Sequence, residues 1–537
     1  MDKALFWSLG GPAAFVRQVV ETAYRHGFVA LQVPSYHPPG LLEAVCSGFE
    51  EVGISPVHNV RAQARGSAVH QMAAAAGITG AGMRSVGGFF DLPTLRGSMF
   101  MVDGVERGDW AIWAPFFRSF ISERRRRRDG LLLPTLVAVI HPNTPRGDVE
   151  RLFPGAIVSW RDRVSSFDIR TYVSKKSGRG RSDLFESAAT EITIGLAGYD
   201  PVLAHALLDM LPSDAIDPWN FLKKAYGANA DTHPHWANGL VDYVDGNVFV
   251  HTAALIAAGD RRSFDIRRWK AVSGPILDFN AMVCRHFADS YSEILERQLP
   301  HVVQTPWGNK TIDHRYGLES KHLRDLLTGT LEYDDEKFMR AAAKARNEVA
   351  HNNVPEHSLI EMLSNAWLAY TTRVPAEARG WYWPRCGQRL ILMVGPSGAG
   401  KSTYAKSNFA SEEIVSTDQI RLELFGAIVK LGTQSEVFSE AAARIVERLS
   451  RGDNAVLDAT NLRKRDRLRV VDLVPPDFEV HYVIVDRPME KKRVDGGWRN
   501  ERAGLLDGHA HLFESEIDTI LTGDGRSNVV VTDVRDM

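Results

Sequence analysis

The sequence predicts a multidomain α/β protein in which a helical domain separates two domains built on parallel sheets. Residues 1–230 and 385–537 each alternate short apolar runs with stretches of helical spacing, whereas residues 265–372 show helical spacing alone. Strands that alternate with helices form parallel sheets that those helices cover. We therefore expect an N-terminal α/β domain, a central all-helical bundle and a C-terminal doubly wound parallel sheet.

Length and composition agree with this division. A chain of 537 residues exceeds what one hydrophobic core ordinarily supports, and 44% hydrophobic with 24% charged residues is typical of soluble globular domains. The net charge of −2 excludes a global attraction to nucleic acid, so any such binding must be local. The three cysteines are widely spaced, the N-terminus does not resemble a leader, and no apolar run is long enough to span a membrane. These features predict a cytoplasmic protein without a membrane partner.

The N-terminal domain is expected to contain a helix over 13–26, a strand over 28–33 and a buried strand over 131–140, with Pro134 near one end. A glycine pair precedes the first helix, but no Gly-Lys-Ser follows it, and the apolar run ending at Ile140 has no terminal acid. In general shape this domain resembles the ATPase-type domains of bacterial defence and signalling proteins with the nucleotide-binding residues lost. That resemblance implies sensing or scaffolding, and an inert structural domain is the other interpretation.

Two basic segments occur in this domain. Arg124–Arg128 lie between two acidic residues, and a loop rich in lysine and arginine covers residues 175–181. Either segment has the charge to contact RNA phosphates. The simpler interpretation, which we favour, is a solvated helix face and a surface loop.

The central domain is expected to contain helices over 280–299, 322–327, 334–351 and 358–371. Arg346, Asn347 and His351 in the third helix form an R-x4-H pattern with a polar residue directly after the arginine. This pattern and its helical surroundings resemble the HEPN ribonucleases. The resemblance implies a HEPN bundle that dimerises and acts on RNA.

These three side chains suit RNA cleavage on chemical grounds. His351 can act as general base or acid near neutral pH, and Arg346 can neutralise charge that builds on a phosphate in the transition state. Asn347 and His351 share a helix face, whereas Arg346 points about 100° away from Asn347. Two antiparallel copies would complete such a site, as HEPN domains commonly do. A non-catalytic helix end with a surface arginine is the alternative.

The most specific motif opens the C-terminal domain. Residues 395–402 fit G-x-x-x-x-G-K-[ST] at every fixed position, after an apolar strand and before a helical stretch. In this motif backbone N–H groups turn toward phosphate, Lys401 reaches the β- and γ-phosphates, and the Ser402 hydroxyl holds Mg²⁺. We therefore expect a P-loop kinase that uses ATP and Mg²⁺. The predicted ATP-binding residues are Gly395, Pro396, Ser397, Gly398, Ala399, Gly400, Lys401, Ser402 and Thr403.

Asp418 and Arg421 follow the second predicted strand of this domain, which covers 413–416. Their D-x-x-R pattern resembles the acceptor motif of polynucleotide 5′-kinases. By that resemblance Asp418 deprotonates a 5′-hydroxyl and Arg421 grips the neighbouring phosphate. The chemistry agrees, because a hydroxyl attacking a γ-phosphate needs an oriented base and a guanidinium matches a phosphate. A helix cap and a surface ion pair are the alternative roles of these two residues.

Asp458, Thr460 and Asn461 follow the third predicted strand, over 455–457, and resemble the D-x-T-N segment of the same kinases. By that resemblance Asp458 holds Mg²⁺ through water, and Thr460 and Asn461 line the acceptor cleft. Further strands are expected over 480–485 and 528–531. The ends of parallel strands are where such sheets bind ligands.

Three arginines after the fourth strand, Arg493, Arg499 and Arg502, are the predicted lid. Arginines supplied by a mobile lid stabilise charge on the transferring phosphoryl group. Arg499 and Arg502 would share one face of a helix, and the sequence does not choose among the three.

The two predicted sites are complementary. A metal-independent ribonuclease that uses the 2′-hydroxyl leaves a 2′,3′-cyclic phosphate and a 5′-hydroxyl, and a polynucleotide kinase takes the 5′-hydroxyl as its acceptor. We expect a chain that cuts RNA, tRNA by analogy, and phosphorylates the new end, which would block ligases that need a 5′-hydroxyl. A toxin or phage-defence role fits this logic. One alternative is a small-molecule kinase similar to zeta-type toxins, and another is a nucleotide-driven switch with a non-catalytic HEPN dimerisation module.

Overall fold

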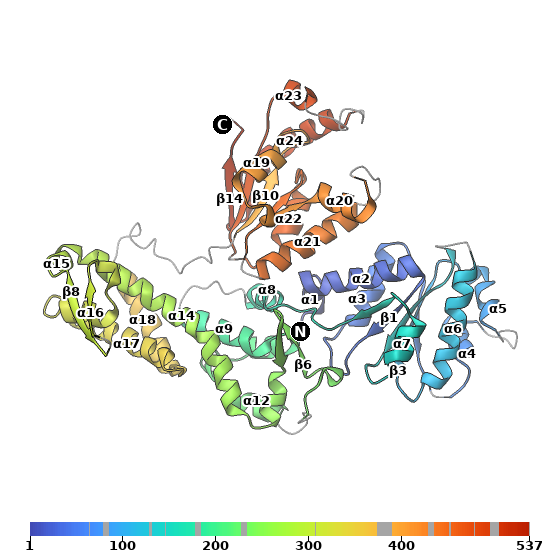
Figure 1. Ribbon diagram of the computed structural model, residues 1–537, viewed down its shortest axis with the longest axis horizontal. Helices are drawn as coiled ribbons and strands as arrows, with labels where there is room; N and C mark the ends of the chain where they lie inside the picture. The colour runs from blue at the N-terminus through green and yellow to red at the C-terminus, as the bar shows by residue number, and fades with distance from the viewer. Residues whose placement is uncertain are drawn as a thin grey trace. The chain divides into compact units, whose positions relative to one another are not determined.

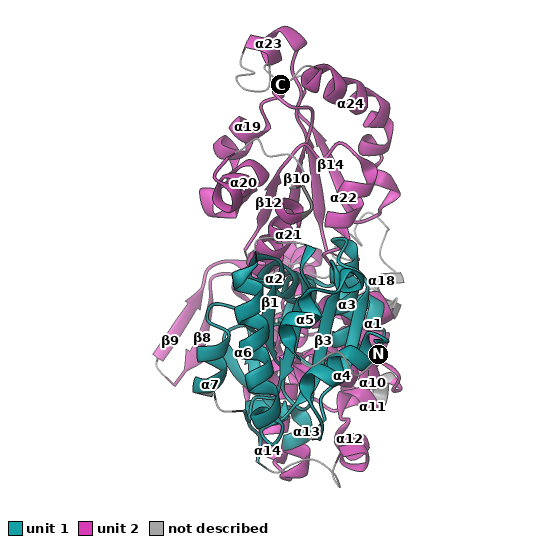
Figure 2. Cartoon of the chain, turned by 90° about the vertical axis from the view of Figure 1, so that its right-hand side faces the viewer, with its two compact units in different colours: residues 1–168, 199–201, 231–254 teal, residues 169–198, 202–230, 255–537 magenta. Residues whose placement is uncertain are grey.

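A computed structural model describes residues 1–63, 65–78, 85–127, 132–144, 146–177, 184–226, 233–306, 308–372, 389–427, 434–450, 453–476, 478–494 and 504–535. The chain, followed by colour in Figure 1, forms two compact units. Unit 1 comprises residues 1–168, 199–201 and 231–254, and unit 2 comprises residues 169–198, 202–230 and 255–537 (Figure 2). Each unit is therefore assembled from separate stretches of sequence.

Unit 1 contains a five-stranded parallel sheet in the order β2-β3-β4-β1-β5. Its strands are β1 (Phe28–Gln32), β2 (Val57–Arg61), β3 (Met99–Val105), β4 (Thr135–Ile140) and β5 (Ile157–Ser159). Strand β4 is buried along its whole length, and β1 is buried over its first four residues. Strands covered on both faces read as continuous apolar runs, which made these two recognisable in the sequence. The parallel sheet predicted for the N-terminal domain is confirmed.

The helices of unit 1 pack an aromatic-rich core against this sheet. Helix α2 begins at Gly10, three residues before the predicted start, because the first turn of a helix tolerates a proline such as Pro12. The helices are α1 (Lys3–Trp7), α2 (Gly10–His26), α3 (Leu41–Glu51), α4 (Ala68–Ala75), α5 (Val86–Phe90), α6 (Trp110–Arg126) and α7 (Arg146–Leu152).

The arginine run at the end of α6 makes contacts within unit 1. The Arg124 guanidinium donates to the carbonyl oxygen of Pro134 at 3.2 Å, and burial lowers the pKa of Arg124 to about 10. Arg126 and Arg127 both pair with Glu123, at 2.7 and 3.3 Å. These contacts favour a structural role for the run. The last arginine of the run, and residues 178–181 of the second basic segment, lie outside the described residues.

A buried polar network joins sequence-distant segments of unit 1. Asp200 is 1% exposed and accepts hydrogen bonds from the Tyr36 hydroxyl at 2.7 Å and from Nε2 of His251 at 3.0 Å. His251 carries its proton on Nε2, because its Nδ1 accepts the backbone N–H of Ala253. An antiparallel hairpin, β6 (Val241–Val244) and β7 (Asn247–Val250), precedes His251.

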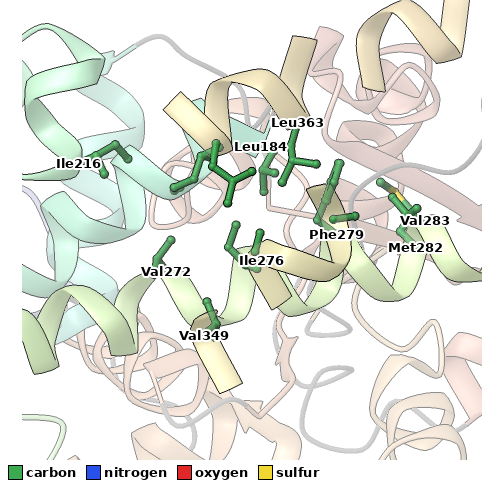
Figure 3. Packing of buried hydrophobic residues seen from close by; sticks show 14 of the residues in the cluster. Leu184, Ile216, Val272, Ile276, Phe279, Met282, Val283, Val349 and Leu363 are labelled. Atoms are coloured by element: carbon green, nitrogen blue, oxygen red, sulfur yellow. The ribbon is translucent and has the colours of Figure 1, made fainter. Parts of the chain in front are cut away.

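The helical part of unit 2 has one continuous hydrophobic core, which extends from Leu184 to Leu363 (Figure 3). Residues 184–222 contribute to this core together with the long helix α14, so it begins earlier in the sequence than residue 265. The helices that lie wholly or partly in this unit are α8 (Ser166–Ser177), α9 (Leu184–Ala197), α10 (Pro201–Leu208), α11 (Pro212–Ile216), α12 (Trp219–Tyr226), α13 (Thr252–Ala257), α14 (Arg261–Ser290), α15 (Ser292–Glu296), α16 (Ser320–Leu326), α17 (Tyr333–Ala350) and α18 (His357–Thr372).

An antiparallel hairpin, β8 (His301–Thr305) and β9 (Gly308–Ile312), interrupts these helices. The prediction of an all-helical central domain is therefore wrong for this stretch. The physical reason is local. The β-branched residues of this stretch favour a pleated strand, and Gly308, which pairs with Thr305 at the turn, adopts φ +113°, where other residues are strained.

The C-terminal part of unit 2 is a doubly wound parallel sheet in the order β11-β12-β10-β13-β14. Each predicted strand is present, and the doubly wound sheet is confirmed. The strands are β10 (Leu390–Val394), β11 (Ile414–Ser416), β12 (Ala455–Asp458), β13 (Val480–Ile484) and β14 (Val529–Asp533). The helices are α19 (Lys401–Asn408), α20 (Thr417–Phe425), α21 (Gln434–Ser450), α22 (Lys464–Val471), α23 (Met489–Val494) and α24 (Leu505–Leu521).

Within the described ranges, none of the helices combines the length and the apolar character needed to cross a membrane.

Candidate active site

The P-loop connects β10 to α19 at the carboxyl edge of the C-terminal sheet. Residue 395 must be glycine, because a Cβ on Gly395 would lie 2.0 Å from the carbonyl oxygen of Val485. Gly400 has φ +98°, which is strained for other residues, and it caps the N-terminus of α19. The loop thus presents the N–H groups of the first turn of α19, which have no intrahelical partners, where this motif binds phosphate.

Lys401 and Ser402 begin α19 and have different partners. Lys401 is 7% exposed, and its ammonium donates to the carbonyl oxygen of Pro396 at 2.7 Å, so it folds across the loop. The Ser402 hydroxyl donates to Oδ2 of Asp458 at 2.7 Å. Burial raises the pKa of Asp458, and the Ser402 hydroxyl and the Lys401 ammonium oppose that shift. A hydroxyl and a carboxylate at the phosphate site are ligands that suit Mg²⁺, so the two residues fit the ion predicted from the sequence.

Asp418 lies in the first turn of α20, directly after β11. Its Oδ1 accepts a hydrogen bond from Nη1 of Arg421 at 2.8 Å, and the two side chains are 39% and 16% exposed. Strands β11 and β12 are neighbours in which Ser416 pairs with Asp458, and the charge of Asp418 contributes to the raised pKa of Asp458. The structure therefore brings the predicted base close to the predicted magnesium ligand.

The segment after β12 supports the P-loop. The Thr460 carbonyl accepts the backbone N–H of Gly395 at 3.1 Å. Asn461 has φ +48° and is 2% exposed, and its Nδ2 donates to the carbonyl oxygen of Met393 at 2.8 Å. The burial of Asn461 makes it a support of the end of β10, whereas the half-buried Thr460 is the residue of this pair that an acceptor can reach.

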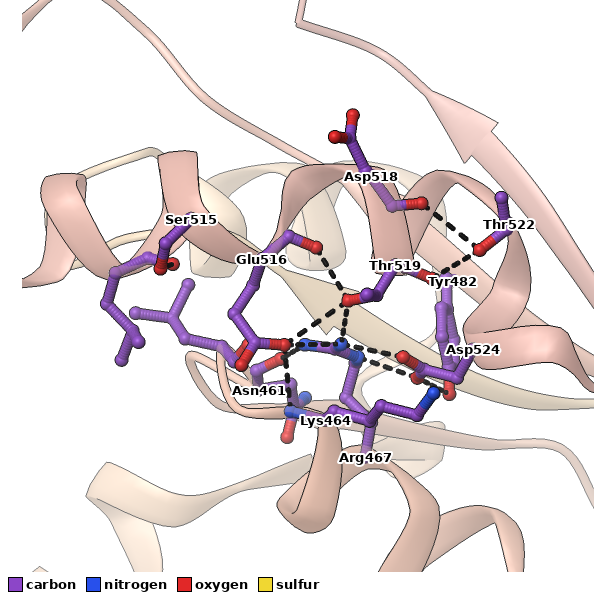
Figure 4. Close-up of polar contacts among 12 residues, drawn as sticks. Asn461, Lys464, Arg467, Tyr482, Ser515, Glu516, Asp518, Thr519, Thr522 and Asp524 are labelled. Carbon is purple, nitrogen blue, oxygen red and sulfur yellow. Dashed lines mark hydrogen bonds and ion pairs between the residues drawn. The ribbon is translucent and has the colours of Figure 1, made fainter.

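A buried arginine holds this segment to the C-terminal helix (Figure 4). Arg467 is fully buried and donates to both carboxylate oxygens of Asp524 at 2.8 Å, to Glu516 at 3.1 Å and to the carbonyl oxygen of Asn461 at 3.2 Å. The Tyr482 hydroxyl also donates to Asp524, at 2.9 Å, and burial raises the pKa of Tyr482. The cluster joins α22, β13 and the end of α24 in one network.

The segment 486–494, which follows β13, also contacts the P-loop. Nε of Arg487 donates to the carbonyl oxygen of Gly398 at 2.6 Å. Lys492 is 3% exposed, and its Nζ lies 2.6 Å from Oδ1 of Asp486. Of the three predicted lid arginines, Arg493 is exposed and donates to Asp507 on α24 at 3.0 Å. The other two, Arg499 and Arg502, lie outside the described residues.

Three residues that contact the P-loop region, His509, Arg487 and Lys492, were not among the predicted site residues. Oγ of Ser397 lies 2.9 Å from Nδ1 of His509, which is more than a hundred residues further along the chain. Arg487 and Lys492 follow β13, and only their position after a strand end indicated a place near the loop. A lysine is rarely buried, so the burial of Lys492 could not be predicted from composition.

Arg346, Asn347 and His351 lie at the C-terminal end of α17, and His351 is the residue that ends the helix. The buried face of α17 is formed by other residues, so Asn347 and His351 are exposed and Arg346 is partly exposed. Nη1 of Arg346 donates to Oδ1 of Asn347 at 3.1 Å, and its Nη2 pairs with Oε2 of Glu319 at 3.2 Å. The structure therefore joins Arg346 to Asn347, although neighbouring positions of a helix diverge by about 100°.

Comparison with known proteins supports a class for the C-terminal part. A family model described as AAA domain matches residues 390–502, which contain the P-loop and four of the five strands. The match, the motif and the parallel sheet together indicate a P-loop kinase-like domain that binds a nucleotide, usually with Mg²⁺. Transcription factor bHLH140 of Arabidopsis thaliana is similar to this chain, with 27% identity over 112 residues. That similarity covers 19% of this chain and 11% of the plant protein, so the chain spans about a tenth of its relative.

Proposed function

We propose that the C-terminal domain is an ATP-dependent polynucleotide 5′-hydroxyl kinase. The observation that carries the proposal is the Asp418–Arg421 pair at the end of β11, next to the strand that ends in Asp458. A base and a phosphate-binding guanidinium held 2.8 Å apart suit an acceptor whose hydroxyl neighbours a phosphate. A small acceptor without that phosphate would leave Arg421 without a role.

Each of the predicted site residues would have a separate role in phosphoryl transfer. Asp418 takes the proton of the 5′-hydroxyl as its oxygen bonds to the γ-phosphorus of ATP, and the bond from that phosphorus to the β,γ-bridging oxygen breaks to release ADP. Lys401 leaves Pro396 and reaches the β- and γ-phosphates, where it stabilises the developing negative charge. Mg²⁺, held by Ser402 and through water by Asp458, would neutralise phosphate charge. Of the three predicted lid arginines, Arg493 is the one within the described residues, and in this proposal it approaches the transferring phosphoryl group.

Replacing Asp418 by asparagine tests this assignment. We expect label transfer from γ-labelled ATP to a 5′-hydroxyl oligoribonucleotide to fall by about 100-fold or more, because the base is lost while the side chain keeps its size. ATP affinity should not change. Glu423→Gln, an exposed carboxylate on the same helix, is the matched control. Transfer by wild-type protein to small acceptors but not to the oligoribonucleotide would favour a small-molecule kinase instead.

A ribonuclease activity of the helical domain is the second proposal. It is supported by the exposure of Asn347 and His351 and by the Arg346–Asn347 contact, which together place a base, a cation and an amide at one helix end. Such a site would cut RNA with the 2′-hydroxyl as nucleophile and leave the 5′-hydroxyl that the kinase uses. Because one copy presents only one such helix end, we propose that two copies of the chain form the complete site. A damaging cut followed by phosphorylation would suit a toxin or phage-defence protein.

His351→Ala should lower the rate of RNA cleavage by about 100-fold or more, because a general acid or base contributes that much. The measurement is gel analysis of labelled RNA incubated without ATP, followed by identification of the new ends. His357→Ala, an exposed histidine at the start of α18, serves as the control. Cleavage that persists in His351→Ala would make the helical domain a non-catalytic module.

A further inference from the structure

Helix α22 and its N-cap residue carry four exposed cationic side chains, which we call the α22 basic face. Arg463 is the N-cap residue, Lys464 and Arg465 are the first two helical residues, and Arg469 lies one turn beyond Arg465. All four are exposed, whereas Arg467 and the valines of α22 face inward. The buried side is fixed by the Arg467 network, so the orientation of the helix on the domain is fixed as well.

This arrangement opposes two local preferences of helices. Cations near a helix N-terminus are unfavourable because that end already has positive potential. Arg465 and Arg469 are four residues apart, where like charges repel. Arg465 lies 3.5 Å from Asp466, and in the described ranges no ion pair joins an acid to the other three cations. Apart from the Arg465–Asp466 pair, the fold leaves this repulsion uncompensated, and a local rule that is broken in this way indicates a function.

The position of the α22 basic face relative to the site follows from the sheet order. Strand β12 lies between β11, which precedes Asp418, and β10, which precedes the P-loop. The loop after β12 therefore begins between the strand ends that lead to the acceptor base and to the phosphate site, and α22, labelled in Figure 1, follows this loop directly. Thr460, in the same loop, is hydrogen-bonded to the first glycine of the P-loop. Arg463 and Lys464 are the first exposed cations after this loop, and the backbone N–H of Lys464 donates to Glu516 of α24 at 3.1 Å.

We propose that the α22 basic face binds the phosphodiester backbone of the acceptor polynucleotide, beyond the 5′ end that reacts. The proposal rests on the kinase function given above and names a surface that a small acceptor would not use. Exposed cations in a row, of which only Arg465 has an ion pair in the described ranges, match a chain of phosphates and do not select a base sequence. The site would therefore prefer long acceptors over mononucleotides and would accept many sequences.

Salt-dependent binding to the full-length chain tests this surface. The probe is a single-stranded 2′-O-methyl oligoribonucleotide with a 5′-hydroxyl, of about 20 nucleotides, longer than the usual single-strand binding site. Its blocked 2′-oxygens cannot serve as nucleophiles, so the proposed ribonuclease cannot cut it. Fluorescence anisotropy would compare wild-type protein with Arg465→Gln/Arg469→Gln. Lys223→Gln/Lys224→Gln, which removes two exposed lysines of α12, is the control for net charge.

Each phosphate contact with a single strand contributes about 0.7 to the slope of log affinity against log salt, so the double variant should have a slope shallower by about 1.4. The same variant should phosphorylate the oligonucleotide poorly but a nucleoside 3′-monophosphate as well as wild-type protein does. Equal slopes for wild type and variant would overturn the proposal. Absence of label transfer to every 5′-hydroxyl acceptor would instead overturn the kinase function, because the binding measurement does not depend on transfer.

Discussion

Lys401→Ala should lower phosphoryl transfer by about 1,000-fold, the upper part of the range seen when one preorganised stabilising group is removed. Lys401 is 7% exposed and its ammonium donates to the carbonyl oxygen of Pro396 at 2.7 Å, so the substitution removes a preorganised positive charge from the loop. Its contact with Pro396 also orders the loop without nucleotide. The measurement is transfer of label from γ-labelled ATP to a 5′-hydroxyl oligoribonucleotide, together with the affinity for a fluorescent ATP analogue.

Lys270→Ala, an exposed lysine of α14, is the control for removal of a lysine. The thermal midpoint of each variant establishes that the fold is kept. A decrease of less than tenfold in transfer, with an unchanged midpoint, would contradict the role given to Lys401. Because Lys401 serves any P-loop kinase, this result would test the phosphotransferase and not its acceptor.

Asp524→Ala should destabilise the C-terminal domain by about 3–5 kcal/mol, because it leaves a buried guanidinium without its main partner. Arg467 is fully buried and donates to both oxygens of Asp524, and Tyr482 donates to the same carboxylate. Glu516 remains as a partner but accepts from one nitrogen only. Hydrogen–deuterium exchange of the amides in β12 and β13 would measure the loss for this domain alone.

Asp518→Ala is the matched control, because Asp518 is exposed on α24, the helix that precedes Asp524, and its carboxylate points away from the cluster (Figure 4). Arg467→Met combined with Asp524→Leu should recover part of the stability, since it removes both buried charges together. The recovery should be incomplete, because the carbonyl oxygens of Asn461 and Leu462 lose their donor. Exchange rates in Asp524→Ala equal to those of wild type would show that the network contributes little to the stability of the C-terminal domain.

The sequence predicted the C-terminal sheet well because its signals are local. An apolar run between a Gly-rich loop and a helical stretch defines β10, and the ends of β11 and β12 are marked by Ser416 and Asp458. The Ser402–Asp458 contact could be predicted as well, since the motif fixes both residues at the carboxyl edge of one sheet. The burial of Lys492 and the His509–Ser397 contact depend on packing between distant segments, which no local pattern encodes.

In the helical region too, local patterns predicted single elements but not the packing between distant segments. Helix α17 was recognisable from its apolar spacing, within one residue at each end. The participation of Leu184 and Ile216 in the core with α14 was not recognisable, because spacing shows that a face is apolar but not which helix covers it. The hairpin β8–β9 was missed because two short strands between strong helical patterns produce little periodicity.

The interleaving of the two units constrains the order in which the chain can fold during its synthesis. Unit 1 requires residues 199–201 and 231–254, so the ribosome makes most of α9–α12 before the N-terminal unit has all its parts. Domains usually fold as they emerge, N-terminal first. Here the sheet of unit 1 would emerge complete while Asp200 and His251, which tie its last segments together, were still to come. A ribosome-bound chain stopped near residue 230 would therefore remain more open to proteases in unit 1 than one stopped beyond residue 254.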